Sequence, residues 1–369
     1  MDNNKKSSSK MSGFSLAAVW FGTHCGGGFA TGTLAVNYYV RYGSWALFMP
    51  LFSLLIMVII GTIQWEICRS HKAYNYRSFA DILYHPHEKV WGTVFEIMFV
   101  VDVVMALAIV FASAGNLIQG FIDVPYMVAV AIFILLIVLL TMFGSKFLLR
   151  IGAVLSLVLI ACLTITSVKG LSANGANFVN IVSHWETGGS FGGAIWSAFL
   201  YASFQCACLA TTHSLTKELP DKKSSLWAGI FGFILNGAMM VLTVCMLLSY
   251  YPDCIGDNLP VFNVLTKLNQ PWLLIAYSAA LFLALVTTSI TCTSSLTARA
   301  ETFVSKIIKN MTVCRFVCST VVLIICFCVA QFGLLAIISK GYSFIGYLCI
   351  PLVIVPTLLL GPKRIKKDT

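Results

Sequence analysis

Residues 20–32 read W-F-G-T-H-C-G-G-G-F-A-T-G, and this stretch places five glycines inside a segment that otherwise has the length and composition of a membrane span. A glycine costs a helix interior about 1 kcal/mol relative to alanine, so the run Gly26, Gly27 and Gly28 is expected to open the helix. Unpaired backbone N–H and C=O groups cannot face lipid, because each costs several kcal/mol there. An opened helix at this depth is therefore expected to line a cavity or to bind a ligand.

The composition outside this stretch is also that of a membrane protein. The chain has 369 residues, of which 59% are hydrophobic and 10% charged, and its mean hydropathy is +0.89. Apolar runs of about 20 residues recur, which is the length that crosses a bilayer as a helix. Residues 1–10 are polar and lead into the first run without a small-residue cleavage site, so no cleaved signal peptide is expected. The sequence predicts an all-α polytopic membrane protein with about ten spans. These are residues 12–41, 44–68, 91–120, 125–144, 147–168, 191–216, 224–250, 271–298, 312–336 and 341–361.

Basic residues are distributed unequally about these spans. With the N-terminus in the cytoplasm, twenty of the 24 Lys and Arg residues fall inside, and only Arg41, Lys169, Lys267 and Lys340 fall outside. This is the positive-inside pattern, and it explains the net charge of +10 without nucleic acid or another anionic partner. We expect a protein of the plasma membrane, surrounded by lipid bilayer, with both termini in the cytoplasm. Its oligomeric state stays open.

The ten spans form two sets of five, and each set begins with an unusual span. The expected divisions are a cytoplasmic tail (1–11), a first repeat (12–168), an extracellular connector (169–190), a second repeat (191–361) and a cytoplasmic tail (362–369). The sixth span contains F-L-Y-A-S-F-Q-C-A-C-L-A-T-T-H-S, where polar residues interrupt an apolar run. The first span starts inside and the sixth starts outside, so the two sets would be inverted. Interrupted helices at matching positions of inverted halves are the best sequence indication of a transporter's binding site.

Ionisable residues inside spans are rare, and each is a candidate functional group. His24 lies in the glycine stretch, where it would bind substrate or take up a proton, or would be a neutral histidine bonded to a carbonyl. Asp102 lies midway along the third span, where it would recognise a substrate amine, pair with His24, or be a structural carboxyl. Glu96 is expected to be structural. Glu66 is expected to pair with Arg69, three residues further along the same helix.

Two loops are expected to contain short helices. Residues 69–89 are amphipathic, basic and aromatic, which is typical of a helix on the inner membrane face. Residues 257–270 carry apolar residues at mixed spacing and are expected to form a short outer helix over the bundle.

The eighth span is rich in hydroxyl groups. Ser and Thr make up more than half of residues 284–297, which read A-L-V-T-T-S-I-T-C-T-S-S-L-T. Isolated hydroxyls in a helix bond back to its own carbonyls, which explains some of them. Adjacent hydroxyls such as Thr287 and Thr288, facing freed carbonyls of the first span, would also form an oxygen cage for a small hard cation. The thirteen cysteines show no paired zinc-ligand spacing, and no structural disulfide is expected.

Four stretches carry a resemblance to a known group: G-T-H-C-G-G-G-F-A-T-G, the Trp65-Glu66 end of the second span, Y-A-S-F-Q in the sixth, and A-x-x-T-T in the eighth. Here the chain resembles YkvI-type membrane proteins of the amino acid–polyamine–organocation superfamily and, more distantly, sodium-coupled transporters with the LeuT fold. The resemblance implies a five-plus-five inverted repeat with discontinuous helices 1 and 6, and substrate held between them. The expected substrate-binding residues are His24, Gly26, Gly27, Gly28, Asp102, Tyr201, Phe204 and Gln205.

In sodium-coupled members of that group, carbonyls beside the break in the first span and a carbonyl plus two hydroxyls in the eighth bind a cation. The matching residues here are Gly22, Cys25, Ala284, Thr287 and Thr288. The resemblance thus implies a sodium site and no other cofactor. It does not supply the substrate.

Together these features predict a secondary active transporter of a small organic solute, an amino acid or related amine, that works by alternating access as a sodium-coupled symporter. The alternatives are a proton-coupled transporter and a non-transporting receptor or sensor on the same scaffold. An enzyme is not expected, because the chain has no paired aspartate motif, H-E-x-x-H or G-x-S-x-G. A channel is not expected either, because no repeated filter sequence or charged ring occurs.

Overall fold

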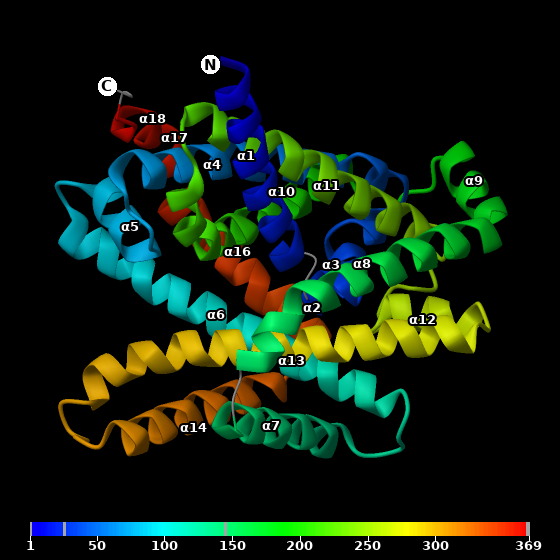
Figure 1. Ribbon diagram of the computed structural model, residues 1–369. Coiled ribbons are helices and arrows are strands. Elements are labelled where there is room, and N and C mark those ends of the chain that lie inside the picture. The colour runs from blue at the N-terminus through cyan, green and yellow to red at the C-terminus, as the bar shows by residue number, and fades with distance from the viewer. Residues whose placement is uncertain (1, 25–26, 144–145, 367–369) are drawn as a thin grey trace.

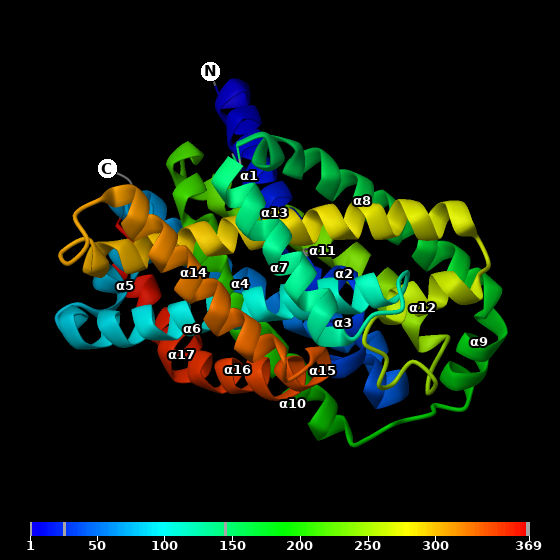
Figure 2. The same ribbon diagram turned by 90° about the horizontal axis from the view of Figure 1, so that it is seen from below.

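The computed structural model describes residues 2–24, 27–143 and 146–366, and every regular element within these ranges is a helix. Helices α5 and α18 lie at one end of the bundle, and α9 and α12 lie at the opposite end (Figures 1 and 2). The first half of the chain contains α1 (Asp2–His24), α2 (Gly27–Ala30), α3 (Thr33–Tyr38), η1 (Val40–Leu47), α4 (Met49–His71), α5 (Tyr76–Tyr84), α6 (Glu88–Gln119), α7 (Tyr126–Phe143), α8 (Lys146–Ala173) and α9 (Gly175–Ser183). The second half contains α10 (Phe191–Cys208), η2 (Leu209–Glu218), α11 (Lys222–Leu248), α12 (Pro260–Lys267), α13 (Pro271–Val304), α14 (Met311–Ala330), α15 (Leu334–Ala336), η3 (Ile337–Tyr342), α16 (Ser343–Cys349), η4 (Ile350–Ile354), α17 (Val355–Leu359) and α18 (Gly361–Arg364).

The helices confirm the predicted all-α membrane fold. In the described ranges, seven helices are long and apolar enough to cross a membrane, or eight if α8 and α9, which meet at a bend of 71°, form one span. Residues 126–140 of α7 form a shorter apolar helix. The predicted total of ten spans stays a prediction.

Local sequence signals explain where several helices begin. The N-cap side chains of Asn75, Asp221 and Asn310 accept hydrogen bonds from backbone N–H groups in the first turns of α5, α11 and α14. Such caps satisfy donors that have no partner within the helix. Proline occupies the first turn of α4, α12 and α13, where its missing N–H costs nothing.

Close packing fixes α1 against α11. A Cβ on Gly232 would overlap the ring of Trp20, so only glycine fits at that point of α11. The Trp20 ring also meets Trp65 of α4 edge to face, with ring centroids 5.6 Å apart. Small residues at such contacts allow helices in a membrane to approach closely. Helices α1, α4 and α11 therefore form one packed group, and α6, α13 and α14 form a second.

Both predicted short helices are present. Helix α5 lies in residues 69–89 and packs on α6, and α12 lies in residues 257–270. They occupy opposite ends of the bundle, as the charge asymmetry predicts (Figure 1). Which end faces the cytoplasm stays a prediction.

Candidate functional site

The first span is interrupted within the described structure at Thr31 and Gly32. Helix α1 ends at His24, α2 makes one turn over Gly27–Ala30, and Gly32 adopts a left-handed conformation (φ 85°) before α3 begins. Only glycine takes this conformation without strain. The expected opening at Gly26, like the expected ligand Cys25, lies outside the described residues, while Gly27 and Gly28 belong to α2.

Carbonyl groups near the interruption have partners from other elements. The Tyr277 hydroxyl of α13 donates to the Ala30 oxygen (2.8 Å), and the Val261 N–H of α12 donates to the Thr31 oxygen (3.1 Å). The Thr31 hydroxyl donates to the Gly28 oxygen (2.8 Å). The interruption is thus held in place by protein groups, as irregular backbone at membrane depth requires.

The sixth span changes its helix type instead of opening, which corrects the expectation of a discontinuous helix there. Helix α10 ends at Cys208, and the chain continues without a gap as the 3₁₀-helix η2. Hydroxyl groups of Thr211, Thr212 and Thr216 each donate to the carbonyl three residues earlier, at 2.7 to 2.8 Å. These bonds keep the carbonyls satisfied in a narrowed helix, so the polar residues that suggested a break stabilise a continuous segment instead.

His24 lies in a buried hydrogen-bonded chain at the end of α1. Its Nδ1 lies 2.7 Å from Asn236 Oδ1 of α11, and its Nε2 lies 2.7 Å from the Tyr201 hydroxyl of α10. The amide of Asn236 donates to the Gly232 carbonyl, which leaves Oδ1 as an acceptor. A neutral His24 with its proton on Nδ1, accepting from Tyr201, satisfies every partner. Gln205 Nε2 reaches the same hydroxyl at 3.5 Å.

The structure agrees with one expectation about His24 and corrects another. A carbonyl partner was expected, and it is the side-chain carbonyl of Asn236. The alternative pairing with Asp102 is not formed, because the two ring nitrogens bond to Asn236 and Tyr201. Sequence reasoning missed Asn236, although an isolated Asn in the apolar run G-I-F-G-F-I-L-N-G-A-M-M could have indicated it.

Aromatic side chains close the site on the α3 side. Tyr201 and Phe204, both expected to cover a substrate, are fully buried. The Phe204 ring stacks on Tyr342 of η3 with centroids 4.4 Å apart, and the Tyr201 ring lies 5.1 Å from Tyr39. The Tyr38 hydroxyl donates to the Ile338 carbonyl at 3.2 Å. These contacts pack α3, α10 and η3 against one another.

Asp102 lies apart from His24, at the point where α10 becomes η2. The residue is 2% exposed, and the Cys208 thiol donates to its Oδ2 at 3.4 Å. Oδ1 is buried and has no hydrogen-bond partner among the described residues. Of the expected substrate-binding residues, His24, Tyr201 and Gln205 are joined by hydrogen bonds and Phe204 packs on Tyr201, whereas the printed partner of Asp102 is Cys208.

The expected sodium ligands are only partly described. The Thr287 hydroxyl donates to the Ala284 carbonyl of its own helix at 2.9 Å, and Thr287 and Thr288 are half-buried. A Cβ added to Gly22 of α1 would have no other heavy atom of the described residues within 4 Å. Helix α13 packs against the first span at α2. The sodium site stays a prediction, since the structure tests neither Cys25 nor the cage as a whole.

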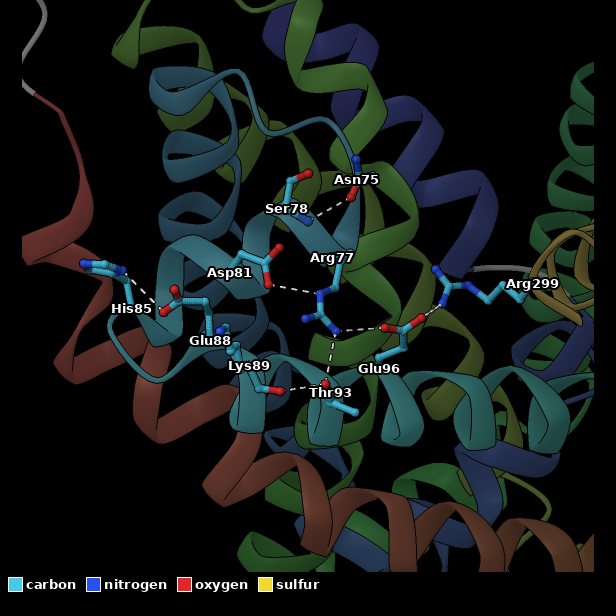
Figure 3. A network of polar contacts seen from close by, with 10 residues as sticks. All are labelled: Asn75, Arg77, Ser78, Asp81, His85, Glu88, Lys89, Thr93, Glu96 and Arg299. Atoms are coloured by element: carbon cyan, nitrogen blue, oxygen red, sulfur yellow. Dashed lines mark hydrogen bonds and ion pairs between the residues drawn. The ribbon is translucent and has the colours of Figure 1, made fainter. Parts of the chain in front are cut away.

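Two clusters of charged residues lie at the α5 end of the bundle. Glu66 pairs with Arg69 (2.7 Å), as predicted, and also accepts a hydrogen bond from Ser225 of α11 at 2.9 Å. In the second cluster, Glu96 of α6 binds Arg77 of α5 (2.9 Å) and Arg299 of α13 (Figure 3). The prediction that Glu96 is structural agrees with these two ion pairs.

The N-cap residue of α11 connects this helix to α1. Asp221 accepts hydrogen bonds from the Ser9 hydroxyl (2.7 Å) and from the Ser224 hydroxyl and N–H. Burial raises the pKa of Asp221, but the hydrogen bonds from Ser224 and Ser9 outweigh it, so the pKa lies below its usual range. The carboxylate is therefore ionised at neutral pH.

Comparison with known proteins identifies the fold. No protein-family model matches the sequence, and no curated protein matches it either. Solved structures that are similar over most of their length include MhsT, a manganese transporter and a sialic acid symporter. MhsT in complex with L-phenylalanine has a TM-score of 0.63 at 13% identity, covering 96% of each chain. A manganese transporter of Eremococcus coleocola, bound to an aromatic bis-isothiourea compound, has a TM-score of 0.60 at 15% identity, covering 98% of this chain and 82% of the other. A Na⁺-coupled sialic acid symporter in a substrate-bound outward-open state has a TM-score of 0.63 at 12% identity, covering 94% and 79%.

At these identities the similarity shows the fold alone. The predicted LeuT fold is confirmed, because all three similar structures are transporters of that fold. The three proteins act on an amino acid, a metal ion and a sugar acid, so the fold does not determine the substrate.

Proposed function

We propose that this protein is a secondary active transporter that carries a small organic solute, an amino acid or related amine, across the plasma membrane by alternating access. It would consist of two inverted repeats of five spans, with both termini in the cytoplasm. The observation that carries the proposal is the interrupted first span at Thr31 and Gly32, in a chain that also buries the ionisable residues His24 and Asp102. Polar groups at membrane depth are costly and are retained for function.

The similar structures support this class of function. MhsT was solved with L-phenylalanine, and the sialic acid transporter is described as Na⁺-coupled. Both substrates are small organic molecules with a carboxylate. We assign the same general class to this chain, with the glycines Gly26, Gly27 and Gly28 as the backbone that contacts the solute.

Sodium is the proposed coupling ion, bound by Gly22, Cys25, Ala284, Thr287 and Thr288. The support is the adjacent hydroxyl pair on α13, since oxygen ligands suit a hard cation. One positive charge entering with the solute gains about 2.3 kcal/mol per 100 mV of membrane potential. Proton coupling is the second candidate, because His24 lies in a hydrogen-bonded chain with Tyr201 and Asn236.

Uptake into proteoliposomes tests the proposal. We expect a labelled amino acid to accumulate under an inward sodium gradient and not under an equal potassium gradient. Thr288→Ala should lower the sodium-driven rate at least tenfold, whereas Thr266→Ala, on the exposed side of α12, should leave it unchanged. An uptake rate that follows a pH gradient alone, and is lost in His24→Gln, would show that the coupling ion is the proton and not sodium.

A receptor would give a different result. It would bind an amino acid, seen as a rise in melting temperature, without uptake under any gradient. That combination, with a protein shown to be correctly inserted, would contradict the transport function.

A further inference from the structure

One face of η2 is polar along its whole length. Residues three apart in a 3₁₀-helix lie on the same face, so Cys208, Thr211, Ser214 and Lys217 form a stripe. Thr211, Ser214 and Lys217 are exposed, and Cys208 is half-buried. The stripe begins at the α5 end of the bundle and ends at Cys208, the residue that touches Asp102.

A second polar face lies on α13. Thr291 and Ser294 are exposed, and Thr287, Thr288 and Cys292 are half-buried. Cys292 lies within electrostatic range of both Cys208 and Asp102, so this face approaches the same point as the stripe on η2.

These faces differ from the surfaces that suit lipid. The exposed residues of α7 are apolar, and they include Met127, Val128, Ile132, Leu135 and Leu139. The hydroxyls of Thr211 and Thr291 bond back to carbonyls of their own helices. Ser214, Lys217 and Ser294 are also exposed, and such polar groups at membrane depth are more stable against water than against hydrocarbon. We therefore treat the faces of η2 and α13 as the walls of a water-filled pathway that leads from the α5 end to Asp102.

Asp102 has unused bonding capacity at the end of this pathway. A carboxylate accepts several hydrogen bonds, but here Oδ2 has one weak thiol donor and Oδ1 has none among the described residues. Among the described residues, the other titratable groups shown within electrostatic range are Cys292 of α13, Tyr342 of η3 and Cys349 of α16, and these three are not cations. A lone buried carboxylate is too costly to remain ionised, so Asp102 requires a proton or a positively charged ligand.

The surroundings of Asp102 favour an ammonium group over a metal ion. Sodium requires several oxygen ligands, and the neighbours of Asp102 are largely thiols, which are soft ligands. The described residues contain no group of three or more His, Cys, Asp or Glu arranged to hold a metal. A primary ammonium brings three N–H donors and one positive charge, which together satisfy both carboxylate oxygens.

We propose that Asp102 binds the ammonium group of the transported solute, which reaches it through the polar pathway between η2 and α13. This assignment rests on the proposed transport function. It specifies that the substrate carries a free, positively charged amine.

Carbodiimide modification of the purified protein tests the assignment directly. The reagent adds to a protonated buried carboxyl, and peptide mass spectrometry locates the adduct. We expect Asp102 to be modified, and n-propylammonium chloride to slow the modification at least fivefold relative to equal concentrations of sodium chloride or tetramethylammonium chloride. Glu66 is the internal control, since it is ion-paired with Arg69 and should stay unmodified. Equal protection by sodium, or no protection by n-propylammonium, would overturn the proposal.

A second measurement decides the case in which the reagent does not reach Asp102. n-Propylammonium should raise the melting temperature of the wild type and of Cys208→Ser, but not of Asp102→Asn, because loss of one charged hydrogen-bond partner weakens binding about tenfold or more. An equal rise in Asp102→Asn contradicts the assignment, as does no rise in the wild type.

Thiol labelling tests the pathway. Thr211→Cys and Ser214→Cys should react with a membrane-impermeant thiol reagent, whereas Ile132→Cys on the apolar face of α7 should not. Peptide mass spectrometry separates these sites from the native cysteines. Unreactive Thr211→Cys and Ser214→Cys would remove the pathway from the proposal.

The two proposals fail separately. Uptake of an amino acid without protection of Asp102 keeps the transporter and removes the ammonium site. Protection of Asp102 without uptake of any solute keeps the site and removes the transport function.

Discussion

The two clusters of charged residues at the α5 end of the bundle are built in different ways. In the buried cluster, the side chains of Glu66 and Arg69 are 3% and 11% exposed, and Ser225 completes the coordination of Glu66. In the chain of ion pairs around Glu96, the side chains of Arg77, Glu96 and Arg299 are 34%, 31% and 29% exposed (Figure 3). Water and salt reach the second cluster far more easily than the first.

The clusters also connect different helices. The buried cluster joins α4 to α11, and the Ser9–Asp221 hydrogen bond joins α11 to α1. The exposed chain joins α5, α6 and α13, and Arg315–Glu301 extends it to α14. Each of these contacts joins helices within one packed group or ties α5 to the second group.

The largest expected difference between the clusters is in stability. Glu66→Gln removes a buried negative charge that pairs with Arg69 and accepts a hydrogen bond from Ser225. We expect a loss of about 3 kcal/mol in the free energy of unfolding, measured by denaturant titration in detergent. The matched variant Glu96→Gln should lose no more than about 1 kcal/mol, because exposed ion pairs contribute little. Losses of equal size would show that burial does not distinguish the two clusters.

The sequence was sufficient to predict the ion pair of the buried cluster, but not the ion pairs around Glu96. Glu66 and Arg69 are three residues apart on one helix, so the spacing alone brings their side chains together. Arg77 and Glu96 lie on different helices, and Arg299 is a further 203 residues along the chain. Such contacts depend on how α5, α6 and α13 pack, which hydrophobic periodicity does not specify.

The candidate site shows the same division. The apolar runs predicted an all-α membrane protein, the family resemblance implied the LeuT fold, and the glycine stretch placed His24 beside an interrupted span. The partner of His24 could not be predicted, because it depends on the rotation of α11, which turns Asn236 toward α1. The expected break in the sixth span was wrong for a local reason. The hydroxyls of Thr211 and Thr212 bond to their own backbone, so the polar residues narrow the helix instead of opening it.

A smaller difference between the two clusters is expected in the salt dependence of their ion-pair coupling energies. The Arg77–Glu96 interaction, measured by a double-mutant cycle with Arg77→Met and Glu96→Gln, should contribute about 0.5 kcal/mol at low salt. It should fall toward zero at 1 M salt, where the Debye length is about 3 Å. The Glu66–Arg69 cycle, with Glu66→Gln and Arg69→Met, should keep most of its larger coupling energy, because salt does not reach a buried pair. Parallel salt dependence of the two cycles would contradict the difference in burial.

The smallest expected effect concerns the link between α1 and α11. The hydrogen bonds from Ser224 and Ser9 hold the pKa of Asp221 below its usual value, which is about 4 in an unfolded chain. The ionised group therefore stabilises the folded state above that value, and the stabilisation is lost as the pH falls through the lower pKa of the folded state.

Asn is as good an N-cap as Asp, so the variant Asp221→Asn removes the charge and keeps the cap. We expect this variant to melt slightly below the wild type at pH 7 and to converge with it under acid conditions. The matched control Asp253→Asn, on an exposed turn, should follow the wild type at every pH. A constant offset between Asp221→Asn and the wild type at all pH values would mean that the α1–α11 link depends on the geometry of the cap and not on its charge.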